Sequence, residues 1–577
     1  MSLLPSLFNK LPAQTRTLVL TCIYGVLGSL IAVAFHHAIA FLFDRIWEPL
    51  STLPRDEFWK FALISFGVLS AGALLSGWLL AVFAPDAAGS GIPQLKLAYW
   101  RDMGEMSLRT VWVKFIAGAV SVGGGLSLGR EGPTVQMAGG LCSWVAGKLG
   151  VVKFERRSAA ACGAAAGLAA AFNTPIAAVT FVLEEIIEDL NNRAIGRILL
   201  ASVVSAFVLY LLVGDDPSFS IPITRQFNWH LYIFGPIAAF FASLVGAAFQ
   251  NLTLGWRRHI KKTSRMPAWS RIWVGAVITW ASACVIFHYF GRLGVLGLGY
   301  HDLNDALSAS LVWQICLALL VAKFLATVAS YAWGGSGGIF APTLFLGGMA
   351  GATFAGLADI GLPMTNQEHI VLTIVGMSSC LGAVVRAPVT SILIVFELTH
   401  DFKLVPLLML SAIISQATSR WLCKENFYSQ ILADDGIHLD KHMGHRDFLH
   451  WNRARLSTFA NFRPVVLNSL DRAAITSLLA ESKYQAIPLT DAGGAILGVV
   501  SREDLERSLA SGEEPHIHAA TTSTADATIG EIQRKLVEAP LNVIVLVDDV
   551  RKSVIGIFTL HDLLRAQLAE SDRAAGG

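Results

Sequence analysis

Charge is scarce in this chain of 577 residues. Only 15% of the residues are charged, 54% are hydrophobic, and the mean hydropathy is +0.55. Because a soluble protein carries about a quarter charged residues, this composition excludes a wholly soluble protein and predicts a polytopic membrane protein with a soluble part attached. The net charge of +2 indicates neither an acidic nor a basic partner, and we expect no binding to nucleic acid.

Cysteine is sparse and unpatterned. The seven cysteines are odd in number, lie far apart in the apolar part of the chain, and form no CxxC or Cys/His spacing. Small buried side chains are therefore a better interpretation than disulfides or metal ligands. The sequence also lacks a Walker loop, a nucleophile elbow and a metal motif, so we expect neither an enzyme nor a required cofactor.

We also expect no cleavable signal peptide. The first apolar run is too long for one and lacks a small-residue cleavage site. Lys10 and Arg16 precede this run, which favours a cytoplasmic N-terminus. Further apolar segments follow as far as residue 432, some continuous and some interrupted by Gly or Pro. The clear spans are about 17–43, 60–84, 196–214, 229–251, 271–290, 310–333 and 403–422, and the interrupted segments lie around 89–93, 129–133, 172–176, 334–342 and 386–388.

The interrupted segments belong to two copies of one repeat. GREGPTVQMAGG (129–140) matches GIFAPTLFLGGM (338–349), and LAAAFNTPIAAVTFVLEE (168–185) matches GAVVRAPVTSILIVFEL (382–398). Such segments at corresponding positions of two halves indicate a transporter binding site. The residues alone do not say whether the copies run parallel or inverted. The matched pairs are Gly129 with Gly338, Pro133 with Pro342, Thr134 with Thr343, Gly139 with Gly348, Pro175 with Pro388 and Glu184 with Glu397.

Two charges lie inside the first of these segments. Arg130 and Glu131 are flanked by glycines and followed by Pro133, in a stretch that is otherwise apolar. An ionisable residue at membrane depth is a functional candidate, because burying its charge is costly. The glycines and the proline predict a helix that begins here, and a helix N-terminus attracts anions. A carboxylate placed where an anion would bind suggests a gate.

The chain becomes polar from Ile437 onward. Residues 437–454 are interpreted as a solvated linker rather than a metal site, although they contain His438, His442, His445 and His450. Residues 455–577 contain a second repeat, in which 495–505 matches 553–563.

Each copy of this second repeat reads as a strand, a hydroxyl residue and a helix. Ser501 and Thr559 are expected to cap the two helices, with Asp504 and Asp562 in the first turns. The expected upstream elements are strands at 486–490 and 543–547 and helices at 473–479 and 529–537.

Four short motifs occur in order across the apolar region: GSGIP (89–93), GREGP (129–133), GGIFAP (337–342) and NFYSQIL (426–432). Together they resemble the anion-pathway signatures of the CLC family of chloride channels and proton/chloride antiporters, and the C-terminal repeat resembles a pair of CBS domains. The resemblance implies an all-α polytopic membrane domain with inverted repeats, followed by an α/β tandem CBS module.

The resemblance also implies a homodimer with one pathway per subunit, both termini cytoplasmic, in the lipid bilayer of a bacterial inner membrane. The implied domains are 1–436 for transport, 437–454 for the linker, 455–511 for CBS domain 1 and 512–577 for CBS domain 2.

The resemblance implies specific ligands for chloride. A central chloride would be held by the hydroxyls of Ser90 and Tyr428 and the amides of Ile339 and Phe340, and an outer one by amides of the turn Arg130–Gly132. Amides and hydroxyls suit this task because a full cationic ligand would trap the anion. Taken singly, Ser90 could be a helix cap, Tyr428 an interfacial aromatic, and Ile339 and Phe340 core residues, but four motifs together favour the chloride site.

The same resemblance makes Glu131 an external gating glutamate, which blocks an anion site when deprotonated and leaves it when protonated. Lys114, in an apolar run upstream, could extend to the membrane interface or add positive potential to the pathway.

The residue at position 185 distinguishes the two functional classes that the resemblance allows, proton-coupled antiporters and passive channels. It maps to the internal proton relay of coupled family members, which typically exchange two chlorides for one proton. Glu184 matches Glu397 in the other half and is expected to satisfy backbone donors, whereas Glu185 aligns with Leu398. An acid present in one half only favours directional function over a solvated helix end. We therefore expect antiport, with a passive chloride channel as the alternative.

Paired CBS domains often bind adenine nucleotides such as ATP or AMP. In this chain Asp504 and Asp562 would contact the ribose, and Ser501 and Thr559 would approach the phosphates. The alternative is that these four residues only cap helices in a module that dimerises. A nucleotide-sensing receptor without transport is a third class, but it leaves the four anion motifs unexplained.

Overall fold

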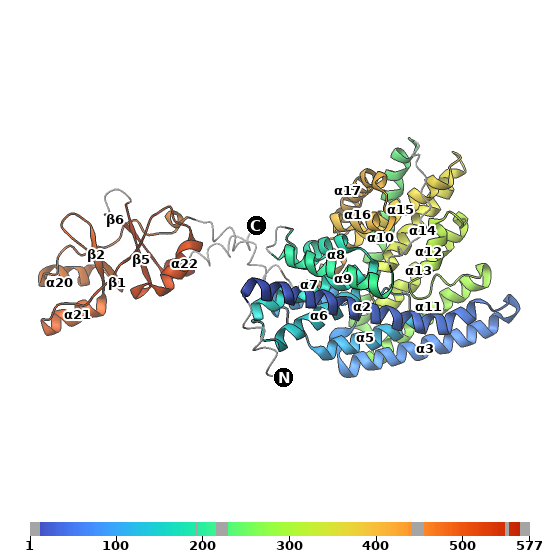
Figure 1. Ribbon diagram of the computed structural model, residues 1–577, viewed down its shortest axis with the longest axis horizontal. Coiled ribbons are helices and arrows are strands. Elements are labelled where there is room, and N and C mark those ends of the chain that lie inside the picture. Colours follow the sequence, from blue (N-terminus) through green and yellow to red (C-terminus); the bar gives the residue numbers. More distant parts are fainter. Residues whose placement is uncertain are drawn as a thin grey trace. The chain divides into compact units, whose positions relative to one another are not determined.

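The computed structural model describes residues 12–190, 194–214, 229–437, 439, 455–548 and 553–565. The described chain divides after Ile437 into two compact units (Figure 1). The first unit is helical, and the second combines helices with two small sheets. The linker histidines predicted to be solvated lie outside the described residues.

Seventeen α-helices build the described part of the first unit. Within it, nine segments are long and apolar enough to cross a membrane. The helices are α2 (Ala13–Ser51), α3 (Phe58–Phe83), α4 (Ile92–Arg101), α5 (Leu108–Gly123), α6 (Glu131–Lys148), α7 (Lys153–Phe172), α8 (Pro175–Phe181), α9 (Ile195–Leu212), α10 (Leu231–Thr263), α11 (Ala268–Phe290), α12 (Tyr300–Leu307), α13 (Trp313–Ala332), α14 (Phe340–Asp359), α15 (Asn366–Val385), α16 (Pro388–Thr399), α17 (Val405–Leu422) and α18 (Phe427–Asp434).

The seven predicted spans correspond to α2, α3, α9, α10, α11, α13 and α17. Two further long apolar helices, α14 and α15, were not predicted as clear spans. Both are almost wholly enclosed by protein, with 89% and 94% of their apolar windows buried. Their ends coincide with the interrupted segments at 334–342 and 386–388, so the breaks obscured the helices between them.

The predicted interruptions are helix ends. Gly91 has a left-handed backbone, with φ of +92°, directly before α4, a conformation that glycine adopts without strain. Pro175 and Pro388 occupy the first positions of α8 and α16, where the missing N–H costs no hydrogen bond. α6 and α14 begin at Glu131 and Phe340, so the two copies of the repeat break at equivalent points.

The two copies contact each other reciprocally. The N–H of Gly129 donates to Gly338 O at 2.7 Å, and the N–H of Gly338 donates back to Gly129 O at 2.6 Å, in antiparallel pairing. Equivalent residues that bond in both directions are what a local two-fold relation produces. The helices that follow, α6 and α14, start from this pairing, in agreement with inverted repeats.

The second unit contains two three-stranded sheets, ordered β1-β2-β3 and β4-β5-β6. The antiparallel pairs β1–β2 and β5–β6 share their register and carry a bulge at the same place, which establishes the internal repeat. The predicted strands and helices are confirmed. The elements are α20 (Arg472–Glu481), β1 (Ala486–Thr490), β2 (Ile496–Ser501), α21 (Arg502–Ser511), β3 (Ile517–His518), β4 (Thr521–Ser523), α22 (Ile529–Glu538), β5 (Val543–Val547) and β6 (Val554–Thr559).

A small shared core joins the two sheets of this unit. Val499 on β2 packs with Val543 and Val545 on β5, and all three side chains are buried. The two repeats therefore fold as one module.

Candidate functional site: a buried anion pathway

The glycine-rich motifs meet through their backbones in the centre of the membrane unit. Gly89 pairs with Ser336 in a parallel bridge, and the N–H of Gly337 donates to Gly89 O at 3.1 Å. Together with the Gly129–Gly338 pairing, these bonds join three segments that are far apart in the sequence.

Glycine is required where these turns touch. A Cβ on Gly132 would lie 2.6 Å from Ser90 O, and a Cβ on Gly338 would lie 2.9 Å from the backbone nitrogen of Gly132. Both distances are shorter than side chains tolerate, so a larger residue would push the turns apart. The close approach leaves backbone groups, rather than side chains, to line the meeting point.

The predicted hydroxyl ligands are both buried. Ser90 is 1% exposed, and its Oγ accepts from the N–H of Ile92 at 3.3 Å, while Gly91 is the residue at the cap of α4. Tyr428 is completely buried on α18, so it is not an interfacial aromatic. Within the described structure its hydroxyl has no hydrogen-bond partner. Because an unsatisfied buried hydroxyl costs about 1–3 kcal/mol, this group is suited to receive an anion.

Ile339 and Phe340 form the start of α14 and are fully buried. The ring of Phe340 packs edge-on against Phe172 and Phe181, with centroids 5.9 and 5.1 Å away. The two side chains therefore belong to the hydrophobic core, which was the alternative interpretation of these residues. Their backbone N–H groups belong to the first turn of a helix, where no carbonyl of the preceding turn is available.

Glu131 is the first residue of α6 and is fully buried. Its Oε1 accepts from the hydroxyl of Tyr300 at 2.8 Å, and its Oε2 lies 3.4 Å from the N–H of Ala341. The carboxylate therefore lies at the start of α14, where the unpaired N–H groups of a helix favour negative charge. Nothing in the sequence motif itself pointed to Tyr300.

The guanidinium of Arg130 contacts other parts of the unit. One nitrogen donates to Ala171 O at 3.0 Å, and another contacts the ring of His36. Gly132 contributes only backbone and packs against Ser90, as described above. Any contribution of the turn Arg130–Gly132 to anion binding would therefore come from its backbone N–H groups.

Lys114 does not reach the membrane interface, and that interpretation is corrected. The side chain is fully buried, and its Nζ donates to Ala87 O at 2.8 Å and Gly89 O at 2.5 Å. The lysine thus holds the loop that carries Ser90. The lysine does not need to extend to the membrane interface, because backbone carbonyls accept hydrogen bonds from its ammonium group inside the protein.

Glu184 performs the predicted backbone task. Its carboxylate accepts from the N–H groups of Val389 and Thr390 at 3.1 and 2.8 Å, at the start of α16. Glu397 accepts in the same way from Ile176 and Ala177 at the start of α8. The expectation of a shared structural role is confirmed.

Glu185 lies next to Glu184 but faces a different environment. The two glutamates belong to a π-helical turn, η3 (Val182–Ile187), which follows α8. Glu185 is only 2% exposed, so the alternative of a solvated helix end is wrong. Its Oε1 accepts from Lys96 Nζ at 2.9 Å, and its Oε2 accepts from Asn426 Nδ2 at 2.8 Å.

Lys96 connects Glu185 to the helix of the predicted chloride tyrosine. This fully buried lysine also lies 2.8 Å from Glu188 Oε1 and donates to Ser429 Oγ at 3.0 Å. Ser429 follows Tyr428 on α18, and Asn426 caps that helix. The sequence reasoning missed Lys96; the available signal was a lysine within an apolar run, three residues after GSGIP.

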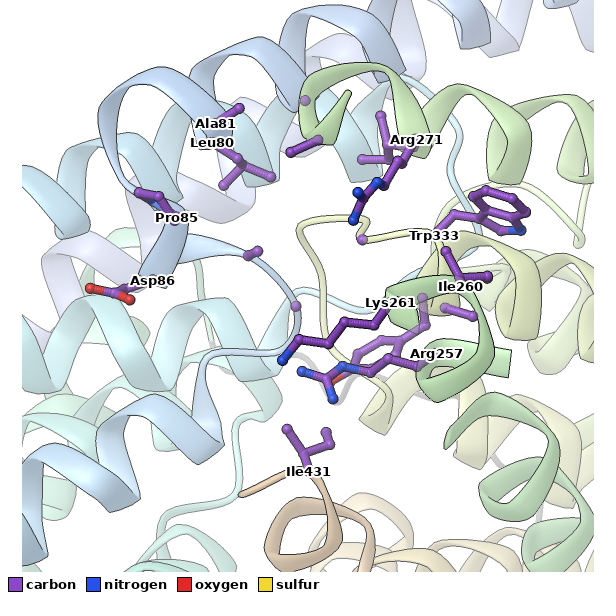
Figure 2. A pocket seen from close by; sticks show the side chains of 18 of the residues that line it. Leu80, Ala81, Pro85, Asp86, Arg257, Ile260, Lys261, Arg271, Trp333 and Ile431 are labelled. Atoms are coloured by element: carbon purple, nitrogen blue, oxygen red, sulfur yellow. The ribbon is translucent and has the colours of Figure 1, made fainter. Parts of the chain in front are cut away.

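A cavity of about 360 Å³ opens beside the Ser90 loop. Gly89 and Gln94 line it next to Ser90, and Figure 2 shows the side chains of Arg257 and Lys261 extending into it above Ile431. Arg257 and Lys261 from α10 both bind Asp435, which directly follows α18. The lining of the cavity combines three basic residues, Arg257, Lys261 and Arg271, with two acidic ones, Asp86 and Asp435.

In the second unit the predicted caps are confirmed. Ser501 Oγ accepts from the N–H of Asp504 at 3.0 Å, and Thr559 Oγ1 accepts from the N–H of Asp562 at 3.1 Å. Each hydroxyl also donates to the carboxylate of its aspartate, at 2.5 and 2.7 Å. The bond from Ser501, which is the largest effect, lowers the pKa of Asp504.

Comparisons with known proteins agree with this geometry. The family model described as voltage gated chloride channel matches residues 72–420, and the CBS domain model matches residues 519–569. The chain is 31% identical over 436 residues to a protein named H(+)/Cl(-) exchange transporter ClcA from Vibrio campbellii, covering 73% of this chain and 90% of the relative. It is 30% identical over 440 residues to the protein of the same name from Salmonella agona, covering 72% of this chain and 88% of the relative.

Solved structures show the same fold. A slow cyanobacterial Cl−/H+ antiporter superposes with a TM-score of 0.64 at 25% identity, covering 73% of this chain and 98% of that one. A eukaryotic CLC transporter superposes with a TM-score of 0.61 at 18% identity and covers 95% of this chain and 98% of that one. The family model matches more than half of the chain. The chain therefore belongs to the CLC, or voltage gated chloride channel, family of multi-pass membrane proteins and carries a C-terminal CBS domain.

Proposed function

We propose that this protein exchanges chloride for protons across the membrane. The observation that carries the proposal is a second buried carboxylate, Glu185, held in position beside α18 while Glu131 sits at the start of α14. A second buried acid beside the helix that carries Tyr428 offers a proton a site that a passive pore does not require. The names of the relatives, proton/chloride exchange transporters at 30–31% identity, support the same function.

Chloride would bind between the Ser90 and Tyr428 hydroxyls and the N–H groups of Ile339 and Phe340. The buried Tyr428 hydroxyl without a partner supports this assignment. A second anion would bind at the N–H groups of the turn Arg130–Gly132. Lys114 would act indirectly, by holding the Ser90 loop.

Glu131 would be the gate of this pathway. As a carboxylate it takes the place of an anion at the start of α14; once protonated it loses its charge and can be displaced. Glu185 would pass the proton to the other side, and chloride would enter through the cavity lined by Arg257 and Lys261.

Flux in liposomes tests the exchange. Chloride is equal on both sides and the pH differs. The reversal potential of a two-to-one exchanger then shifts from zero by about 20 mV per pH unit, because three charges move per cycle. A reversal potential of zero under these conditions would sink the antiporter proposal and leave a channel. Glu185→Gln should keep chloride flux and lose proton movement, whereas Glu184→Gln is the matched control in the neighbouring position.

A passive chloride channel is the second candidate. The observation that favours it is the tight pairing of Glu185 with Lys96 and Asn426, which could make the acid a fixed structural partner. If proton movement survives Glu185→Gln unchanged, the relay assignment is wrong.

We further propose that the CBS module binds an adenine nucleotide through Ser501, Asp504, Thr559 and Asp562. Each pair places a hydroxyl and a carboxylate at the first turn of a helix, where phosphate and ribose could be bound. Calorimetric titration of the full-length protein with ATP and with AMP tests this. Absence of binding would leave these residues as helix caps in a structural module.

Family membership also leads us to propose an oligomeric state and a location for this protein. We expect a homodimer in a bacterial inner membrane, with both termini in the cytoplasm and with domains at 1–436, 437–454, 455–511 and 512–577. Cross-linking in native membranes would reveal the dimer.

A further inference from the structure

The gate carboxylate is held from two sides by two different helices. α14 offers the N–H of Ala341 to one oxygen at 3.4 Å, and α12 offers the hydroxyl of Tyr300 to the other at 2.8 Å. The tyrosine contact is the shorter of the two and has the length typical of an O–H···O bond, whereas the amide contact is long. The position of the Glu131 side chain therefore depends on Tyr300 as well as on the helix N-terminus.

We propose that Tyr300 is a latch for the gate: its hydroxyl holds the deprotonated Glu131 in the anion site, and breaking this bond is part of opening. The proposal deepens the proposed function and rests on the role of Glu131 as gate. A hydrogen bond to a charged carboxylate is roughly twice as strong as one between neutral groups. Tyr300 therefore stabilises the blocking, charged form of the gate more than the protonated form.

The loop that presents Tyr300 is fixed in place. Gly299, with φ of +76°, directly precedes α12. Lys323 on α13 is fully buried and donates to Gly297 O at 2.7 Å and Val295 O at 3.3 Å. The hydroxyl is thereby positioned by the fold rather than by a mobile surface loop.

The internal repeat shows that this loop corresponds to the one that carries Ser90. Lys114 binds the carbonyls of Ala87 and Gly89 just as Lys323 binds those of Val295 and Gly297. The two lysines hold equivalent loops in the two halves. One loop presents a proposed chloride ligand, and the other presents the partner of the proposed gate.

The charged and titratable groups around Glu131 come from its own turn, from α12 and from α18, whose buried Tyr428 also interacts with it electrostatically. Arg130 precedes it and interacts with it electrostatically, and Tyr300 donates to it. α14 contributes backbone N–H groups at its first turn. Tyr300→Phe removes the hydroxyl and leaves the ring, so the packing of α12 is kept.

The test compares the pH dependence of chloride flux in liposomes for the wild type and Tyr300→Phe. Without the latch, the gate is protonated and displaced more easily. We expect flux at pH 7 to rise several-fold, and the pH of half-maximal flux to move upward by about one unit, equivalent to a tenfold change in proton affinity. At low pH, where the gate is already protonated, the two proteins should converge. Tyr24→Phe is the control, because this buried tyrosine on α2 lies outside the proposed pathway.

Glu131→Gln and the double variant separate the two proposals. If Glu131 is the gate, Glu131→Gln abolishes the pH dependence, and adding Tyr300→Phe changes flux less than twofold. A Tyr300→Phe profile identical to the wild type, with Glu131→Gln behaving as a gate variant, overturns the latch alone. If Glu131→Gln keeps the wild-type pH dependence, the assignment of Glu131 as the gate is wrong. An equal effect of Tyr300→Phe in both backgrounds would also overturn the latch.

Discussion

The buried ammonium of Lys96 allows the charge network around Glu185 to be tested energetically. Its Nζ lies 2.9 Å from Glu185 and 2.8 Å from Glu188, and no part of the side chain is exposed. Methionine is similar in length and lacks the charge, so Lys96→Met removes the ammonium with little change in volume. Removing one partner of a buried ion pair costs about 3–5 kcal/mol, because the remaining charge is left uncompensated. We expect the variant to lose this much stability.

A second substitution should rescue much of that loss. Removing both charges of a buried pair is often nearly neutral, so Lys96→Met combined with Glu185→Gln should be more stable than Lys96→Met alone. Glu188 is 24% exposed and can regain water. Lys60→Met is the matched control: its pair with Glu57 is as short, at 2.5 Å, but the side chains are 41% and 38% exposed. An exposed pair contributes about 0–1 kcal/mol.

Thermal unfolding in detergent, followed by loss of the folded peak in size-exclusion chromatography, gives the order of stability. The expected order is wild type close to Lys60→Met, then the double variant, then Lys96→Met. Two results would refute the reasoning: a double variant no more stable than Lys96→Met, or a loss for Lys60→Met as large as that for Lys96→Met. Either would mean that the buried charges do not dominate the effect.

Three further predictions concern single side chains. Glu397→Ala leaves two N–H groups of α8 without their acceptor and should cost about 1–3 kcal/mol in the same unfolding assay, whereas Glu397→Gln should cost less. Lys114→Met should release the loop of Ser90 and weaken chloride binding measured by calorimetry, while an unchanged affinity would contradict its positioning role. Because the pKa of Asp504 is lowered in the folded module, its contribution to stability is present above the unfolded pKa of about 3.9 and is lost as pH falls through the folded value. Asp504→Asn should therefore remove part of the loss of structure that we expect circular dichroism of the full chain to record as the pH falls below the unfolded pKa.

Much of the fold could be predicted because apolar length and helix-breaking residues are local signals. The seven clear spans and the breaks around Gly91, Pro175 and Pro388 all correspond to helices or helix ends. α14 and α15 were missed because a helix enclosed by protein needs no lipid-facing surface, and breaks at its ends make it look short. In the soluble module β1, β2, β5 and β6 were predicted, since β-branched runs between turns are also local, whereas the two- and three-residue strands β3 and β4 were missed.

The candidate site was predictable only in part. The motifs named Ser90, Glu131 and Tyr428, but not their partners. Tyr300 lies 169 residues from Glu131, and Lys96 lies 89 residues from Glu185. No local pattern encodes a contact of that separation; only the fold brings these atoms together.

The internal repeat separates structural from functional residues in this chain. Where both halves keep the same residue type, the side chain satisfies backbone groups: Glu184 and Glu397 accept from helix N-termini, and two buried lysines hold equivalent loops.

Several residues of the proposed pathway have a different residue at the equivalent position of the other half. Glu131 corresponds to Phe340, and Glu185 corresponds to Leu398. With Gly89 equivalent to Gly297, Ser90 corresponds to Leu298 and Tyr300 to Ile92. A duplicated scaffold is symmetric, but coupling needs a direction, and a direction requires groups that one half has and the other lacks. Tyr300 satisfies this criterion together with Glu131 and Glu185, which places the latch among the residues that break the symmetry rather than among those that maintain it.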